Sequence, residues 1–269
     1  MKRIFVVAAM LLLGASLLNA QDAAAGAAAN AGANAASIVH SSRNRIQKVS
    51  VSSRSRMVIT AKDGSTSDRI IDQVSKDGPN GGRTVIVFVR PANVAGTRFL
   101  TMDTASGGTD QWIFLPALGK VRRIAASESG GSFMGTDFSY DDISSVDRDA
   151  SLDNHKLLRE EPLNGNLCYV IESIPKDSSF QYSKIISWIE KEKYLNCKME
   201  LYNRRGELIK IMEMSDFKDV QDRLTPMQTK MSTVRAGTST TIYMDNIEYD
   251  REIRDGVFTP AYLETGRAR

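Results

Sequence analysis

Few residues of this 269-residue chain are placed to do acid–base or nucleophilic chemistry. His40 and His155 are its two histidines, and neither has a catalytic partner at a recognisable spacing. Asp141 and Asp142 are adjacent carboxylates, but neighbouring residues of a helix do not face each other, so a helix-start role is expected instead of a shared substrate. Ser132 does not lie in a Gly-x-Ser-x-Gly pattern. We therefore expect no enzyme, and a hydrolase is the disfavoured alternative.

Metal and redox chemistry have equally little support in the sequence. Cysteine, histidine and carboxylates do not gather at ligand spacing, so no metal and no cofactor is expected. Cys168 and Cys197 are the two thiols, and an oxidising compartment would permit them to pair. A strand expected over 182–190 separates them by two strand spacings, roughly 9–10 Å, whereas a disulfide needs Cα atoms within about 7 Å. Both outcomes stay open.

Residues 111–143 carry the strongest pattern, because an aromatic strand, a basic strand and an apolar loop follow one another. Trp112 and Phe114 alternate with aliphatic residues, so that strand has no polar face and should be covered on both sides. The basic strand, residues 120–124, should meet water on one face. Phe133 and Met134 then stand in a glycine-rich loop where turn chemistry favours polar residues. Such a loop is expected to cover something, as a lid.

The elements that position these residues are mainly strands, separated by joints rich in glycine and proline. Short helices are expected over 36–46, 139–147 and 152–160, with Ser139 and Asp142 as a capping pair in the second. The expected strands cover 49–60, 68–76, 83–90, 97–103, 111–115, 120–125, 167–174, 182–190, 196–203, 208–217 and 240–249. The fold class is α+β and mostly β: a large curved antiparallel sheet of about 11 strands, closed by a few short helices. Such a sheet exposes more apolar surface than its helices can fill, so a hollow is expected.

Alternation along the strand near residue 200 predicts which side chains share a face of the sheet. Met199 and Leu201 are expected on one face, and Lys198, Glu200 and Tyr202 on the other. The strand around Trp188 is apolar on both sides. It is expected to be central, with Trp188 buried or half-buried.

The chain resembles the periplasmic lipoprotein-sorting (LolA-like) family, in a divergent branch, from about residue 46 to about 264. The residues that carry the resemblance are Arg90-Pro91, Gly96 to Leu100, Trp112 to Pro116, Val121 to Ile124, Ser132 to Tyr140, Asp142, Tyr243 to Tyr249 and Phe258 to Pro260. The resemblance implies an incomplete β-barrel whose concave face receives acyl chains. The long stretch of Ala, Gly and Asn near the amino terminus has no counterpart in the family.

Two sets of binding residues follow from the strand pattern and the resemblance together. Methionine adapts to flexible acyl chains, although it also fills ordinary cores. Lysine and arginine could form a rim for an anionic head group or an acidic partner, or a solvated outer face. The expected cavity lining is Leu100, Met102, Trp112, Phe114, Ile185, Met199, Leu201, Met212 and Met244. The possible basic rim is Arg90, Arg98, Lys120, Arg122 and Arg123.

The amino terminus reads as a secretory signal, with Lys2 and Arg3 before an apolar run and small residues up to Ala20. We expect a cleaved signal peptide over 1–20, a flexible Ala/Gly/Asn tether over 21–36 and one binding domain over 37–269. The domain is expected in the periplasm. Its net charge of +3, from 35 basic and 32 acidic side chains, does not suggest nucleic acid as a partner.

The sequence therefore predicts a soluble periplasmic carrier for a lipid or an acylated lipoprotein, working as a monomer with transient, peripheral membrane contact. The alternative is an adaptor that docks on an inner-membrane transporter of the resistance-nodulation-division type.

Overall fold

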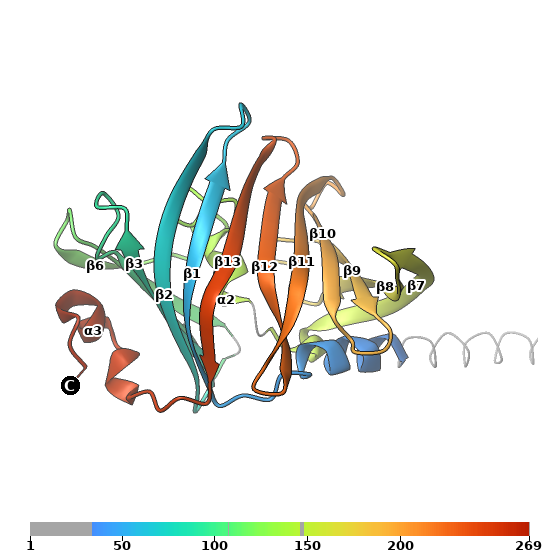
Figure 1. Cartoon of the computed structure of the whole chain (residues 1–269), viewed down its shortest axis with the longest axis horizontal. Helices are drawn as coiled ribbons and strands as arrows, with labels where there is room; N and C mark the ends of the chain where they lie inside the picture. Colours follow the sequence, from blue (N-terminus) through green and yellow to red (C-terminus); the bar gives the residue numbers. More distant parts are fainter. Residues whose placement is uncertain (1–33, 107, 146–147, 269) are drawn as a thin grey trace, which may run out of the picture.

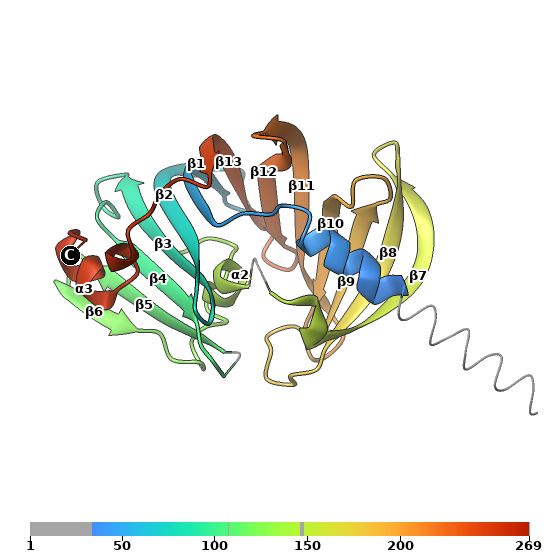
Figure 2. The same cartoon turned by 90° about the horizontal axis from the view of Figure 1, so that it is seen from below.

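The computed structural model describes residues 34–106, 108–145 and 148–268. They form one 13-stranded antiparallel sheet that bends into an arch and does not close into a barrel (Figures 1 and 2). The strand order is β6-β5-β4-β3-β2-β1-β13-β12-β11-β10-β9-β8-β7. The sheet thus consists of two meanders, β1–β6 and β7–β13, joined where β1 pairs with β13. The predicted fold class is confirmed.

The first meander, here the left wing, contains β1 (Ser50–Thr60), β2 (Thr66–Gly78), β3 (Gly81–Arg90), β4 (Arg98–Asp103), β5 (Thr109–Leu115) and β6 (Lys120–Arg123). The second, the right wing, contains β7 (Asp153–Leu163), β8 (Asn166–Pro175), β9 (Lys184–Glu190), β10 (Asn196–Tyr202), β11 (Leu208–Val220), β12 (Arg223–Thr233) and β13 (Thr238–Tyr249). The helical segments are the N-terminal helix (residues 34–43), α2 (Tyr140–Ser144), η1 (Ala150–Leu152), η2 (Asp255–Val257) and α3 (Pro260–Thr265).

Two elements differ from the sequence prediction. Residues 152–160 were expected to be helical, and this was wrong, because most of them belong to the edge strand β7. An edge strand has one side free of neighbours, and charged side chains there discourage unwanted pairing, so its polar sequence fits that position. The strand β12 was not predicted, because Pro226 lies within it.

The two edges of the sheet are joined by the segment that follows β6. Since β6 and β7 lie at opposite edges, this connection must cross the arch. Residues 124–145 of it, here called the strap, lie on the concave face and include α2 (Figure 2).

The sheet is covered on both faces. On the concave face, strap residues complete a left-wing core around Phe88, Phe99 and Ile113, and a right-wing core around Ile185 and Leu201. The N-terminal helix packs on the same face over β8 and β9. On the outer face of the left wing, the segment that ends in α3 covers β3–β5. The covering of β5 on both sides is therefore confirmed.

The expectation for Trp188 is confirmed, since its side chain is 5 % exposed and it lies on β9, between β8 and β10. Cys168 and Cys197, whose pairing the sequence left open, are both free, and β9 separates their strands. The opening helix was expected over 36–46 but covers 34–43, so residues 34–36, which were assigned to the tether, belong to it, and Ala35 is fully buried. The expected signal peptide and the expected tether up to residue 33 lie outside the described residues. None of the described helices is both long and apolar enough to cross a bilayer.

Candidate functional site

The strap is shaped by a tight turn followed by a capped helix. Met134 and Gly135 have positive φ angles of 53° and 76°, which turn the chain so that Phe133 points into the sheet. Ser139 is the N-cap of α2, and its hydroxyl and the Asp142 carboxylate form the capping box that the sequence predicted.

Phe133 is a core residue of the concave face. Its side chain is fully buried, and its ring centroid lies 5.7 Å from that of Phe88, 5.1 Å from that of Phe99 and 5.5 Å from that of Tyr140. Met134 is half-buried beside it. The loop covers the concave face, and Phe133 fills space that the sheet side chains leave.

Asp137 fixes the strap to the centre of the sheet. Its carboxylate accepts hydrogen bonds from the hydroxyls of Thr233 (2.6 Å), Thr238 and Thr240 (2.8 Å), which lie on β12 and β13. Cross-strand pairing gathers these hydroxyl donors opposite Asp137, since Thr233 on β12 pairs with Thr238 on β13.

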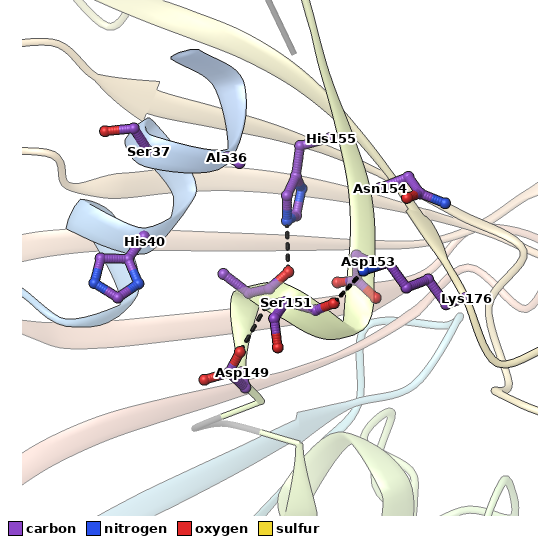
Figure 3. Close-up of a pocket in the computed structure, with 10 residues that line it drawn as sticks. Ala36, Ser37, His40, Asp149, Ser151, Asp153, Asn154, His155 and Lys176 are labelled. Atoms are coloured by element: carbon purple, nitrogen blue, oxygen red, sulfur yellow. Dashed lines mark hydrogen bonds between the residues drawn. The ribbon is translucent and has the colours of Figure 1, made fainter. Parts of the chain in front are cut away.

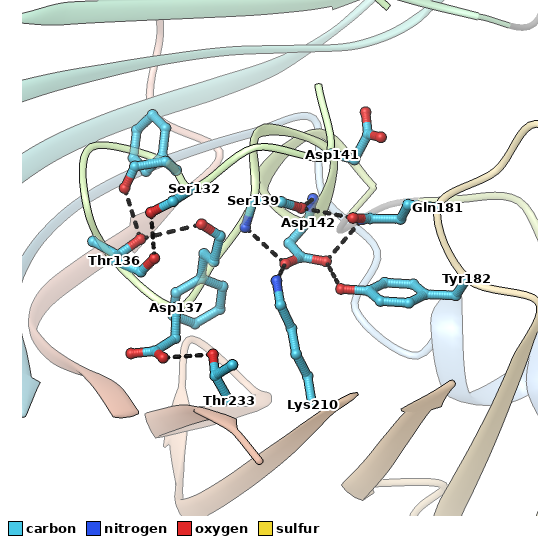
Figure 4. Close-up of polar contacts among 12 residues, drawn as sticks. Ser132, Thr136, Asp137, Ser139, Asp141, Asp142, Gln181, Tyr182, Lys210 and Thr233 are labelled. Atoms are coloured by element: carbon cyan, nitrogen blue, oxygen red, sulfur yellow. Dashed lines mark hydrogen bonds and ion pairs between the residues drawn. The ribbon is translucent and has the colours of Figure 1, made fainter. Parts of the chain in front are cut away.

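Asp142 fixes the strap to the right wing (Figure 4). Its carboxylate accepts hydrogen bonds from Lys210 Nζ at 2.7 Å, Tyr182 Oη at 2.6 Å and Gln181 Nε2 at 3.0 Å. Burial and the neighbouring carboxylate raise the pKa of Tyr182 well above its usual range, so the hydroxyl remains a donor. The ion pair between Asp142 and Lys210 is largely removed from water, because the Asp142 side chain is 6 % exposed and the Lys210 side chain is 15 % exposed.

Asp141 turns to the left wing, so the two adjacent carboxylates serve different sites. Its carboxylate accepts a hydrogen bond from Ser129 Oγ at 2.9 Å. Among the described residues, no lysine or arginine forms an ion pair with Asp141. Burial raises the pKa of Asp141 above its usual value.

This shift gives a pH-dependent prediction for Asp141→Asn. A carboxyl whose pKa is raised in the folded state binds its proton more tightly there, so its contribution to stability falls as pH rises from the ordinary aspartate value, about 3.9, to the raised one. The asparagine variant lacks that decline. Urea unfolding of both proteins from pH 3 to pH 7 should show the variant gaining stability relative to the wild type as pH rises. A constant difference would mean that Asp141 titrates normally.

The predicted cavity residues fall into two groups. Leu100, Met102, Trp112 and Phe114 lie on the outer face, against the segment that includes Phe258 and α3. The others lie on the concave face: Ile185, Met199, Leu201 and Met212 in the right-wing core, and Met244 beside Ser55 at the centre of the sheet. One cavity cannot be lined by both groups, because they lie on opposite faces of the sheet.

The concave group includes a half-buried surface rich in methionine. Met199 pairs with Met212, and Met212 pairs with the fully buried Met231. Met214 and Met244 are also half-buried. This surface is apolar and adaptable, although it is not deeply enclosed.

The predicted basic rim is not a single surface. Arg122 pairs with Glu128, and Arg123 with Asp110, from opposite faces of β6. Arg98 donates to the Leu263 carbonyl at the end of α3, at 2.8 Å. Arg90 and Lys120 are exposed, at the ends of β3 and β6.

A hollow of about 700 Å³ opens beside the N-terminal helix, away from the predicted lining (Figure 3). His40, Asp149, Asp153 and Lys176 line it together with His155. His155 bonds to Ser173 Oγ and to the Ala150 carbonyl, both at 2.8 Å, and burial lowers its pKa. It therefore acts here as a neutral structural residue.

Sequence reasoning missed several polar residues of the concave face. Lys210 and Tyr182 were not singled out, although a lysine among apolar neighbours in a strand is a signal of a buried partner. Thr101 and Gln111 were also missed. Both are buried on the concave face of the left wing, 5 % and 4 % exposed.

A family model with the description "Uncharacterized protein" matches residues 81–265, more than half of the chain, which therefore belongs to that family. Among curated proteins no match was found. Among solved structures, a protein domain from Vibrio parahaemolyticus, described as a candidate for outer membrane lipoprotein sorting, is 27 % identical with a TM-score of 0.81. The match covers 87 % of this chain and 99 % of that one.

Two further structures agree. A DUF1329 family protein from Desulfovibrio piger is 29 % identical with a TM-score of 0.82, over 87 % of this chain and 99 % of that one. A LolA superfamily protein from Nitrosomonas europaea is 22 % identical, with a TM-score of 0.69 over 85 % and 98 % of the two chains, and shows the shared fold. These likenesses are consistent with the divergent LolA-like family that the sequence resembles. In this fold, the concave face and its strap form the candidate site.

Proposed function

We propose that this LolA-like protein is a soluble periplasmic carrier. It binds the acyl chains of a lipid or lipoprotein on the concave face and carries them towards the outer membrane. The observation that carries the proposal is that the strap, rather than the sheet itself, completes the apolar core under the arch, with Phe133 inserted into the left-wing core and Phe138 into the right-wing core. The similar domain described as a candidate for lipoprotein sorting supports the same reading.

An acyl chain could replace the strap on energetic grounds. Burying roughly 14–16 methylenes is worth on the order of 10 kcal/mol, at about 0.8 kcal/mol for each. Displacing the Phe133 ring costs about 3–5 kcal/mol. The surplus covers part of the cost of association. The half-buried methionines beside the strap offer an apolar surface to which an acyl chain can bind before the strap moves.

The proposal is tested with mature protein prepared from the periplasm. We expect it to carry lipid that extraction and mass spectrometry detect, and to bind a fluorescent fatty acid. Met212→Asp, on the concave face, should weaken the probe tenfold or more, because a carboxylate then faces the acyl chain. Met102→Asp is the matched control, since Met102 is equally half-buried but lies on the outer face.

Two results would contradict the carrier. One is a protein that is empty after purification and inert to the probe. The other is an equal loss of probe binding in both variants while circular dichroism shows both to be folded, since binding would then not depend on the concave face.

A docking role is the second candidate. It is favoured by the filled concave face, where the strap packs against both wings in the described residues. An adaptor would stay bound to an inner-membrane transporter in detergent extracts, whereas a carrier would be released. Affinity capture with tagged protein, followed by identification of retained membrane proteins, separates the two.

A further inference from the structure

A row of polar side chains crosses the concave face of the left wing. Ser75 pairs with Thr84, Thr84 with Thr101, and Thr101 with Gln111, across four neighbouring strands. Each is the direct neighbour of the next. In β3, β4 and β5 these positions are two residues from Ile86, Phe99 and Ile113, which form the apolar core under Phe133. The row therefore lies beside the aromatic core and on the same face.

Two members of this row each have a buried side-chain oxygen without a hydrogen-bond partner. Ser75 Oγ and Thr84 Oγ1 bond to each other at 2.9 Å. Thr101 Oγ1 and Gln111 Oε1 are buried and have no partner. A buried polar atom without a partner costs roughly 1–3 kcal/mol, so two neighbours in this state require an explanation.

The orientation of Gln111 shows which chemistry the row can accept. Its amide nitrogen donates to Ser144 Oγ at 3.1 Å, and Ser144 Oγ in turn donates to the Asp141 carbonyl oxygen at 3.2 Å. Since the single hydroxyl proton of Ser144 is used in that bond, the group that donates to Ser144 is the Gln111 amide nitrogen, and the amide oxygen is the atom left without a partner. Asp141 adds a negative charge beside it, and no lysine or arginine within the described ranges pairs with that charge. Two acceptors and a carboxylate thus lie together.

We propose that Thr101, Gln111 and Asp141 bind the primary ammonium group of the cargo. A primary ammonium carries one positive charge and three donors, which match the carboxylate, the amide oxygen and the hydroxyl oxygen. This inference rests on the proposed carrier function and names its cargo chemistry. The ammonium could belong to the head group of an aminophospholipid or to a lysine of an acylated peptide.

The position of the row suits a head group attached to acyl chains. Two residues along a strand span about 6.6 Å. A chain that replaces Phe133 over Phe99 and Ile113 therefore brings its polar end to Thr101 and Gln111. Only the turn of the strap that carries Phe133 must lift for this to happen, because α2, which carries Asp141, stays on the row through Ser144.

The test measures lipid transfer from vesicles of defined composition to the mature protein. Vesicles contain phosphatidylethanolamine and phosphatidylcholine with identical chains, and the lipid bound after gel filtration is quantified by mass spectrometry. The wild type should extract phosphatidylethanolamine at least tenfold better, because the quaternary ammonium of phosphatidylcholine has no N–H donor. Gln111→Leu and Asp141→Asn should lower the ratio of extracted phosphatidylethanolamine to phosphatidylcholine from tenfold or more to about one. Thr84→Val is the matched control, since Thr84 lies in the same row but bonds to Ser75.

A second arm identifies the source of the ammonium. A diacylated peptide with one lysine competes with the lipid, and the same peptide with acetylated lysine serves as its control. Stronger competition by the free lysine supports the ammonium site and points to lipoprotein cargo. Preference for phosphatidylethanolamine alone supports it and points to lipid cargo.

Three outcomes would overturn the inference. If the wild type extracts both lipids equally and the lysine peptide has no advantage, the ammonium site is absent but the carrier stands. If Gln111→Leu stabilises the protein without changing any preference, the row holds only a buried water. If no lipid, peptide or fatty-acid probe binds, the carrier itself fails and the inference fails with it.

Discussion

Phe133→Ala is expected to make the protein less stable and a better binder of acyl chains. The ring is fully buried among Phe88, Phe99 and Tyr140, so its loss should lower the free energy of unfolding by about 3–5 kcal/mol. The same change lowers the free-energy cost of binding an acyl chain, because the acyl chain no longer has to displace the Phe133 ring. Apparent affinity for a fluorescent fatty acid should therefore rise roughly tenfold or more, because the open form becomes more populated.

Phe258→Ala is the matched control for this experiment. Phe258 is 3 % exposed and packs on the outer face of the same wing. It should cost comparable stability in urea unfolding without raising probe affinity. If both variants bind the probe as the wild type does, Phe133 is an ordinary core residue and the strap does not compete with cargo.

Asp142→Ala is expected to release the strap from the right wing. The substitution removes the acceptor for Lys210, Tyr182 and Gln181 and leaves a lysine, 15 % exposed, without its ion pair. Breaking a buried pair costs about 3–5 kcal/mol. Hydrogen exchange should accelerate at strap amides, among them those of Phe133 and Ile143, while amides of β8 and β9 keep their protection.

Asp72→Ala is the control for an exposed ion pair. Asp72 pairs with Arg54 at 2.6 Å on the outer face, but the two side chains are 41 % and 55 % exposed. Such pairs are worth about 1 kcal/mol or less. Unchanged exchange of the strap in Asp142→Ala would show that Asp137 and the aromatic contacts hold it alone.

The parts of the fold that depend on neighbouring residues were predictable from the sequence. The capping box at Ser139 and Asp142 spans four consecutive residues, and alternation assigned Met199 and Leu201 to one face. Strand β7 was misread because Leu157 and Leu158 lie among charged residues, as on an amphipathic helix. Strand β12 was not predicted because it contains Pro226, and proline is uncommon inside strands.

The candidate site could be predicted only in part, because long-range pairing assembles it. Asp142 meets Lys210 across 68 residues and Tyr182 across 40. Apolar residues on both sides of β4 and β5 showed that both faces are covered, but not which face is concave. Leu100 and Phe99 are both fully buried, yet only the bend of the whole sheet places Phe99 under the strap.

The seam between β1 and β13 has a consequence for the order of synthesis. Val51 pairs with Tyr249, so one edge of β1 has no partner until nearly the whole chain has been made. The first six strands can form hairpins one after another as they emerge, since each pairs with the next. The nascent left wing is therefore a sheet with an open edge at β1, the kind of edge that recruits other chains. A folding helper that shields this edge must leave before β13 arrives, and a chain truncated before residue 238 would keep the edge open and be prone to aggregate.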